Sequence, residues 1–370
     1  MLGCRVGIFS SKKTAPSFTT GQVASLVIGQ PDFTTATFGC TSSRCSTTWL
    51  GALINGTYLY IGDNLNNHRF LIFNTLPTSN GPVATGVLGQ PDFTTTTSGC
   101  TQNKFNSPNS IRICSANNKL YVVDCYNQRI MVYNSPPTGQ VNADSVMGQP
   151  DFTSNGGGCG PRSFFYPRDI FFVGSKCLLT DYNHRVLIWN DITTYNQSST
   201  VPDIILGQPD ATTNTIRSVS ANSFQNPEGV WSDGTKVIVG DSVRNRVLIW
   251  NTFPTINNQN ADIVIGQPDF ITSTSGLSNI KFNNCQYVGS NGIFLAISDR
   301  GNTRILVWYS IPTATNTPAD AVLGQTNFTS NSGGTSSTKF NNGVGVGVAG
   351  NDIYAFDSNN YRVLKFTNGS

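Results

Sequence analysis

The sequence is poor in charge and almost empty of two residue types. Only 12% of its 370 residues are Asp, Glu, Lys or Arg, Glu228 is the sole glutamate, and the histidines are His68 and His184. Its net charge of +3 comes from scattered Lys and Arg, whereas binding a nucleic-acid backbone requires a clustered basic surface. No apolar run approaches the roughly 18 residues of a membrane-spanning helix. We therefore expect no nucleic-acid partner and no membrane span.

Helical patterning is also missing. The apolar runs are short, rich in Val, Ile, Leu, Phe and Trp, and bounded by Gly, Asn, Asp or Pro, as in KLYVVD from Lys119. Runs of this kind predict β-strands, because no window keeps the 3.6-residue apolar period of a helix. The abundance of Thr, Ser and Asn beside few Lys and Glu is typical of an extracellular or cell-surface protein.

What the chain does contain is a repeat. The segment VIGQPDF and its variants occur six times, with their glycines at Gly29, Gly89, Gly148, Gly207, Gly266 and Gly324. These glycines are 58 to 60 residues apart. A constant period of this length indicates a repeat architecture.

A second signature follows the same period, an aspartate that ends one apolar run and an arginine that begins the next. The aspartates are Asp63, Asp124, Asp181, Asp241, Asp299 and Asp357. The arginines are Arg69, Arg129, Arg185, Arg246, Arg304 and Arg362. Because a short carboxylate at a turn accepts backbone N–H groups and can pair with arginine, we interpret these residues as structural staples rather than as a metal ring. His68 and His184 occupy a freely exchanged position of the same turn, so they are interpreted as surface turn residues.

Six units of four short strands predict an all-β, six-bladed β-propeller of four-stranded antiparallel blades. We name the strands of a blade A to D from the axis outward. The last unit lacks strand D, and the first GQPDF segment has no inner strands before it, so residues 23–30 are expected to complete the last blade and close the ring.

The propeller is expected to occupy residues 21–370. Residues 1–20 include RVGIFS from Arg5, which resembles a C strand. It would be the seventh C strand in a propeller of six blades. We interpret this segment as an N-terminal arm or surplus strand, either a displaced remnant or the end of a longer repeat array. It is expected to lie against its own propeller, with self-assembly through another subunit as the alternative.

The repeats also carry a resemblance to a known family. The segments DYNHRVLIWN from Asp181 and DSVRNRVLIWN from Asp241 resemble the NHL repeat. Together with NTFPTINNQNADIVIGQPDF from Asn251, they make the chain similar to uncharacterised, often secreted bacterial GQPDF-repeat proteins. The resemblance extends over residues 25–366 and implies a propeller. Its implications for function are broad, since NHL propellers include scaffolds, RNA binders, peptide-processing lyases and carbohydrate binders.

The nine cysteines are an odd number. Three occupy equivalent places, and each could bond to a second cysteine of its own unit, which predicts the pairs Cys40 with Cys45, Cys100 with Cys114, and Cys159 with Cys177. Such disulfides would contribute about 2–4 kcal/mol each; free thiols in loops are the alternative. The sequence contains no C-x-x-C pair of the kind that indicates a zinc site. We expect no cofactor and no metal ligand, and a channel Ca or Zn ion is the minority alternative.

Function in a repeat protein is sought where the repeats differ. One position at the start of strand A carries Leu50, Asn109, Arg168, Glu228, Gln286 and Val344. The B–C turns on the same face supply Tyr126, Tyr182, Arg244, Arg300 and Tyr361. Apart from Leu50 and Val344, these residues are the predicted ligand site at the mouth of the central channel. The alternative is an ordinary solvated rim carrying an exposed Arg168–Glu228 pair.

No catalytic residue is predicted. We expect a non-enzymatic binding or structural module of a cell or particle surface, which binds a protein or glycan ligand on the face formed by the D–A and B–C loops. The alternative is an NHL-like metal-dependent hydrolase or lyase with its site in the central channel.

Overall fold

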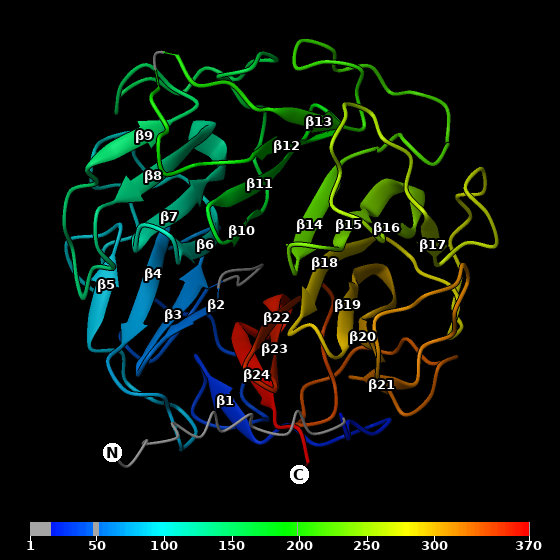
Figure 1. Ribbon diagram of the computed structural model, residues 1–370. Helices are drawn as coiled ribbons and strands as arrows, with labels where there is room; N and C mark the ends of the chain where they lie inside the picture. The colour runs from blue at the N-terminus through cyan, green and yellow to red at the C-terminus, as the bar shows by residue number, and fades with distance from the viewer. Residues whose placement is uncertain (1–15, 47–51, 198, 370) are drawn as a thin grey trace, which may run out of the picture.

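The computed structural model describes residues 16–46, 52–197 and 199–369. In this part of the chain, six four-stranded antiparallel sheets surround a central axis (Figure 1). The predicted fold class, a six-bladed all-β propeller, is therefore confirmed. RVGIFS from Arg5 and Leu50 lie outside the described residues.

We number the blades 1 to 6 in chain order. The A strands are β2 (Ala52–Asn55), β6 (Pro108–Cys114), β10 (Ile170–Val173), β14 (Pro227–Ser232), β18 (Cys285–Ser290) and β22 (Val344–Ala349). The B strands are β3 (Tyr58–Asp63), β7 (Lys119–Asp124), β11 (Lys176–Asp181), β15 (Val237–Asp241), β19 (Leu295–Asp299) and β23 (Asp352–Asp357). The C strands are β4 (Arg69–Phe73), β8 (Arg129–Tyr133), β12 (Arg185–Trp189), β16 (Arg246–Trp250), β20 (Arg304–Trp308) and β24 (Arg362–Phe366).

The D strands are the shortest and lie at the outside. They are β5 (Gly86–Leu88), β9 (Ser145–Met147), β13 (Ile204–Leu206), β17 (Ile263–Ile265), β21 (Ala321–Leu323) and, for blade 6, β1 (Leu26–Ile28). Four of the B–C turns contain a 3₁₀ turn, namely η1 (Cys125–Asn127), η2 (Ser242–Arg244), η3 (Arg300–Asn302) and η4 (Ser358–Asn360). Because each blade is packed between two others, inner strands such as β12 are buried on both faces. This explains why their sequences are continuously apolar rather than alternating.

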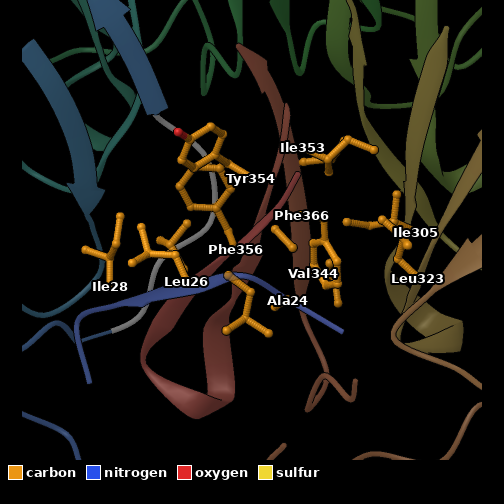
Figure 2. Packing of buried hydrophobic residues seen from close by; sticks show 14 of the residues in the cluster. Ala24, Leu26, Ile28, Ile305, Leu323, Val344, Ile353, Tyr354, Phe356 and Phe366 are labelled. Atoms are coloured by element: carbon orange, nitrogen blue, oxygen red, sulfur yellow. The ribbon is translucent and has the colours of Figure 1, made fainter. Parts of the chain in front are cut away.

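The ring closes through its first strand. β1 pairs antiparallel with β24, with Leu26 opposite Lys365 and Ile28 opposite Val363. Figure 2 shows Leu26 and Ile28 beside side chains of blade 6, with Ile305 of blade 5 on the other side of the cluster. The buried cluster thus continues from blade 5 through blade 6 into blade 1, as the closure prediction requires.

The two ends of the described chain meet at this closure. The backbone N–H of Ser17 donates to Oδ1 of Asn368 at 2.7 Å, and Phe18 is fully buried with its ring edge-on to Phe294. Residues 16–20 therefore lie against the propeller as part of the C–D linker of blade 6. The arm predicted over residues 1–20 otherwise falls outside the described residues.

The outer strands are covered at their free edges. The N–H of Val27 in β1 donates to Oδ1 of Asn80, and its carbonyl accepts from the N–H of Gly81, in the C–D linker of blade 1. In blade 5 the carbonyl of Val322 accepts from the N–H of Gly21. Occupied in this way, these edges do not offer an open template for another strand.

The repeated aspartate and arginine form a buried ion pair in every blade. The N···O distances of the six pairs are 2.7–2.9 Å, and all twelve side chains are inaccessible to solvent. In blade 4, Arg246 also donates to the carbonyls of Phe270, Ser220 and Ser223. Each staple arginine thus joins the D–A loops on the two sides of its blade, which satisfies a buried charge with several partners.

The structure of the D–A loop explains why the repeated motif contains Gly followed by Gln. Gly148 has φ +87°, and a Cβ there would lie 2.3 Å from the ring of Phe164, so only glycine fits. Gln149 donates from Nε2 to the carbonyls of Gln128 and Gly156. The motif therefore fixes the start of each D–A loop.

The described cysteines are all free thiols, so the predicted disulfides are not shown and stay a prediction. Cys40 donates to the carbonyl of Phe93 at 3.2 Å, and Cys100 to that of Ser154 at 3.4 Å. Cys159 contacts the carbonyl of Ala211 in the same way. The first cysteine of each predicted pair therefore contacts the D–A loop on the other side of its blade. The predicted partners Cys45, Cys114 and Cys177 are instead buried in the blade cores.

Candidate functional site

A pocket of about 440 Å³ lies where the D–A and B–C loops surround the axis. We call it the mouth pocket. Its lining residues are Tyr126, Phe165, Tyr166, Arg168, Tyr182, Gln286 and Arg300. They come from blades 2, 3 and 5, so the pocket is built from positions at which the repeats differ. Its volume and its mixture of aromatic and polar groups are typical of a ligand site.

The floor of the pocket contains an ion pair between neighbouring blades. Nε of Arg168 lies 2.7 Å from Oε2 of Glu228, and these residues are only 4% and 1% exposed. The hydroxyl of Tyr182 donates to the other oxygen of Glu228. The Arg168 guanidinium also lies over the Tyr182 ring, 4.9 Å from its centroid. The exposed pair expected from the sequence is therefore a buried pair with fixed partners.

A tyrosine from the opposite side of the ring completes this floor. Tyr287 of blade 5 reaches Asn109 of blade 2, and the distance from Asn109 Nδ2 to the tyrosine oxygen is 3.2 Å. The same amide donates to the carbonyl of Arg168 at 2.7 Å. Since blades 2 and 5 face each other across the axis, this contact spans the channel beneath the pocket. We call Asn109, Arg168, Tyr182, Glu228 and Tyr287 the axial network.

The ionisable groups of the axial network are held in defined states. Burial raises the pKa of Tyr182, and the nearby Glu228 carboxylate raises it further. Burial likewise raises the pKa of Tyr287. Cys125, whose sulfur lies 3.5 Å from Nη1 of Arg168, has its pKa raised by burial to about 11. At neutral pH the two phenols are therefore proton donors and Cys125 is a neutral thiol.

Irregular strand starts direct part of the network toward the axis. The register of strand A against strand B shifts between Pro108 and Ile111 in blade 2, and equivalent shifts occur in blades 4 and 5. Asn109, Glu228 and Tyr287 lie within these shifted segments. A β-bulge turns side chains away from the regular strand direction and often occurs beside functional sites.

Tyr166 is held in an unfavourable backbone conformation at the edge of the pocket. Its φ is +44°, at a position where Ser107, Asn226, Asn284 and Asn342 also have positive φ. A bulky residue is an outlier in this left-handed region, and such strain is concentrated at functional sites.

The ring of Tyr166 belongs to an aromatic group at the mouth. Its centroid lies 5.5 Å from that of Tyr126, 4.7 Å from that of Phe165 and 6.3 Å from that of Tyr182. Tyr126 and Phe165 are each 41% exposed. The strained backbone of Tyr166 therefore places its ring among side chains that solvent reaches.

The structure brings most of the predicted mouth residues together. Tyr126, Tyr182, Arg168, Gln286 and Arg300 line the mouth pocket. Asn109 and Glu228 lie in the floor below it.

Two predicted residues and one aligned residue belong neither to the lining of the pocket nor to its floor. Arg244 is buried and donates to Oγ of Ser223, while Tyr361 packs edge-on against Phe38 with centroids 5.8 Å apart. Val344, at the aligned start of strand A, is part of the hydrophobic core. Arg244 and Tyr361 stand three and four residues after their turn aspartates, whereas Tyr126 and Tyr182 stand two and one after theirs. They therefore point in other directions.

Three residues of the site were missed from the sequence, namely Phe165, Tyr166 and Tyr287. Comparison of the D–A loops would have found the first two, because the described blades have Asn or Gln in place of Phe165 and Ser or Asn in place of Tyr166. Tyr287 stands where blades 2, 3 and 4 have Ser110, Asp169 and Gly229. Its residue type differs from those of its equivalents as clearly as Arg168 and Glu228 differ from theirs.

The two histidines link neighbouring blades. Nδ1 of His68 accepts the N–H of Ser107, and Nδ1 of His184 accepts that of Asn226. Burial lowers the pKa of both imidazoles. Within residues 16–46, 52–197 and 199–369, no group of three or more His, Cys, Asp or Glu side chains is arranged to hold a metal ion.

Comparison with protein families matches the NHL repeat over residues 105–133. This segment contains β6, β7 and β8, the three inner strands of blade 2. No curated protein matches the chain, and the described residues contain no helix long and apolar enough to cross a membrane. The match concerns the repeat itself and leaves the narrower resemblance to secreted GQPDF-repeat proteins a prediction.

Proposed function

We propose, for a chain that belongs to the NHL-repeat β-propellers, a non-enzymatic binding function at a cell or particle surface. Its ligand, a protein or a glycan, enters the mouth pocket on the face formed by the D–A and B–C loops. Propellers of this family commonly serve as protein-binding scaffolds, which agrees with a binding function but does not identify the site.

The observation that carries the proposal is the aromatic mouth pocket above a closed floor. Tyr126, Phe165 and Tyr166 form a partly exposed aromatic group around a concave space. Tyr166 keeps the left-handed backbone of its loop position although its side chain is bulky, and strain of this kind has to be offset by the surrounding structure. A fixed, concave and partly apolar surface favours binding because little ordering is required when a ligand arrives.

The chemistry of the floor also favours binding over catalysis. Glu228 accepts from Arg168 and Tyr182, so its carboxylate serves as their partner rather than as a proton acceptor for a ligand. His68 and His184 accept backbone N–H groups at blade junctions. General acid–base catalysis needs a carboxylate, an imidazole or a similar group within hydrogen-bond reach of the reacting atom.

The test is a binding measurement on immobilised cell-envelope material with three purified proteins. These are the native chain, the double variant Tyr126→Ser/Phe165→Ser, and the control Ile216→Ser, whose side chain is 62% exposed on another D–A loop. We expect the double variant to bind at least tenfold more weakly, while the control binds like the native chain. Equal binding by all three would overturn the proposal. Near-unit retention of Ca or Zn together with hydrolysis of an added ester or peptide would favour the hydrolase or lyase alternative.

A further inference from the structure

The polar groups of the mouth pocket are mainly hydrogen-bond donors. The guanidinium group of Arg300 carries five N–H donors and no acceptor, whereas that of Arg168 is paired with Glu228 in the floor. Gln286 adds an amide with two N–H donors and one carbonyl acceptor. The carboxylate of Glu228 lies below the pocket and is engaged by Arg168 and Tyr182. A matching ligand must therefore present acceptor oxygens toward the pocket.

The aromatic group requires an apolar surface on the same ligand. The rings of Tyr126, Phe165 and Tyr166 are fixed against one another, mostly edge to face. Aromatic faces are negative and attract the weakly positive hydrogens of C–H groups. They also attract cations, but a cationic ligand would be repelled by the guanidinium group of Arg300, which lines this pocket.

The fold disfavours an extended peptide as the occupant. A peptide that adds to a sheet needs an open strand edge, and the edges of outer strands such as β1 and β21 are already hydrogen-bonded to C–D linkers. The mouth pocket lies on the axis instead, holds about 440 Å³ and is closed below by Tyr287 and Asn109. It therefore suits one compact group rather than a continuous segment.

We infer that the mouth pocket binds an acidic sugar, a pyranose ring that carries a carboxylate. Its C–H face packs on the aromatic group of Tyr126, Phe165 and Tyr166. Its carboxylate faces Arg300, because a guanidinium matches a carboxylate in both charge and geometry, and its hydroxyls accept from Gln286. This inference rests on the proposed function and specifies the ligand class of the same pocket.

The test uses glucuronic, galacturonic and N-acetylneuraminic acids as probes, each compared with neutral glucose and galactose by calorimetric titration. The variants are Tyr166→Asn, Arg300→Gln and the control Ile216→Ser. Tyr166→Asn introduces the residue found at this position in blades 4, 5 and 6, so its fold is expected to be preserved. Far-UV circular dichroism checks the fold of every variant.

We expect at least one acidic sugar to bind tenfold or more tightly than the neutral sugars. Arg300→Gln should remove that difference, Tyr166→Asn should weaken binding at least tenfold, and Ile216→Ser should change nothing. Equal binding of acidic and neutral sugars, or no binding of any probe, would overturn the inference.

A second measurement separates this inference from the proposed function. Retention on cell-envelope material should be lost after periodate oxidation of that material and survive its treatment with protease. If retention still depends on Tyr126 and Phe165 but is lost on protease treatment, the ligand is a protein. In that case the binding function stands and the sugar assignment is wrong. Retention that does not depend on Tyr126 and Phe165 means that both proposals are wrong.

Discussion

Among the described residues, two kinds of buried ion pair between arginine and a carboxylate have an N···O distance below 3 Å. The staples, such as Arg246 with Asp241, occur in all six blades. The pair of Arg168 with Glu228 occurs once, at the axis between blades 3 and 4. The N···O distances are nearly the same in both, so the pairs differ in their surroundings rather than in their own geometry.

Those surroundings explain their different roles. A staple arginine donates mainly to backbone carbonyls of two loops, as Arg246 does to Phe270 and Ser220. The side chain of Arg168 contacts other side chains instead, including Tyr182 and Cys125. Repeated pairs thus hold the backbone of the ring together, whereas the unique pair arranges the side chains under a pocket.

The largest decrease in the free energy of unfolding is expected from opening the ring without removing a staple. A chain that starts at Asp32 loses β1 and Phe18 but keeps Phe33, whose carbonyl accepts from Arg362. Each buried apolar side chain that is lost contributes about 1.5–3 kcal/mol, so we expect the free energy of unfolding to fall by more than about 5 kcal/mol. Urea denaturation measures this change. An unchanged midpoint would show that β1 does not close the ring.

The next largest loss of unfolding free energy is expected when a staple is replaced, and it can be compared directly with replacement of the axial pair, Arg168 with Glu228. Replacing the staple with Asp241→Leu/Arg246→Met leaves one buried and two partly buried carbonyls without their donor. At about 1–3 kcal/mol for each unsatisfied group, the loss should reach about 3–6 kcal/mol. The matched variant Arg168→Met/Glu228→Leu should cost less than about 2 kcal/mol, because hydrophobic replacement of a whole buried pair is often tolerated. Equal losses in urea denaturation would remove the distinction between the pairs.

A smaller effect is expected at the left-handed position of the D–A loops. Tyr166→Asn should raise the free energy of unfolding by up to about 1 kcal/mol, since it relieves backbone strain. The reverse change, Asn226→Tyr, imposes the strain where no aromatic group supports it and should cost about 1–2 kcal/mol. Thermal denaturation of both variants tests this. A stabilised Asn226→Tyr protein would show that the position carries no strain.

The smallest effect concerns exposed aspartates of the GQPDF loops. Hydrogen bonds from the backbone N–H of Thr94, and then from its hydroxyl, lower the pKa of Asp92 from 3.8 to about 2. Because the folded pKa is the lower one, this stabilisation is complete above about pH 4 and is lost as the pH falls toward 2. NMR titration of the Asp92 carboxyl should show the lowered pKa.

The matched variant is Asp92→Asn, since Asn327 makes the equivalent bond to Thr329 in blade 5. Its D–A loop should keep its amide shifts from pH 4 to pH 2, while the native loop changes. Identical acid responses of the two loops would contradict the assignment.

The sequence was sufficient for the fold because the fold is repeated. Each strand, each turn aspartate and the completion of blade 6 by residues near Val27 follow from the period, and every copy supports the others. The residue positions of the staples were predictable for the same reason. Their hydrogen bonds were not, because the partner carbonyls of Arg246 come from loops whose mutual approach is set by the packing of neighbouring blades.

The mouth was only partly predictable because it does not follow the period. The alignment placed Arg168 beside Glu228, but it could not show that Tyr287 crosses the axis to Asn109 and buries the floor. That contact depends on local register shifts at the start of strand A, which leave no clear signal in one sequence. The cysteine pairs were predicted from closeness along a unit, which does not by itself imply closeness within a blade.

The hydrogen bond between Ser17 and Asn368 has a consequence for how the pocket is oriented when the propeller is attached to a support. Strand C runs away from the B–C turn, so the C–D linker that contains this contact lies on the face opposite the mouth. Domain ends that lie close together allow a domain to be joined to others at one place. Chain that precedes Ser17 or follows Asn368 departs from the described residues at that far face. A propeller tethered in this way would point its pocket outward from the support, where a soluble ligand or a neighbouring surface could reach it.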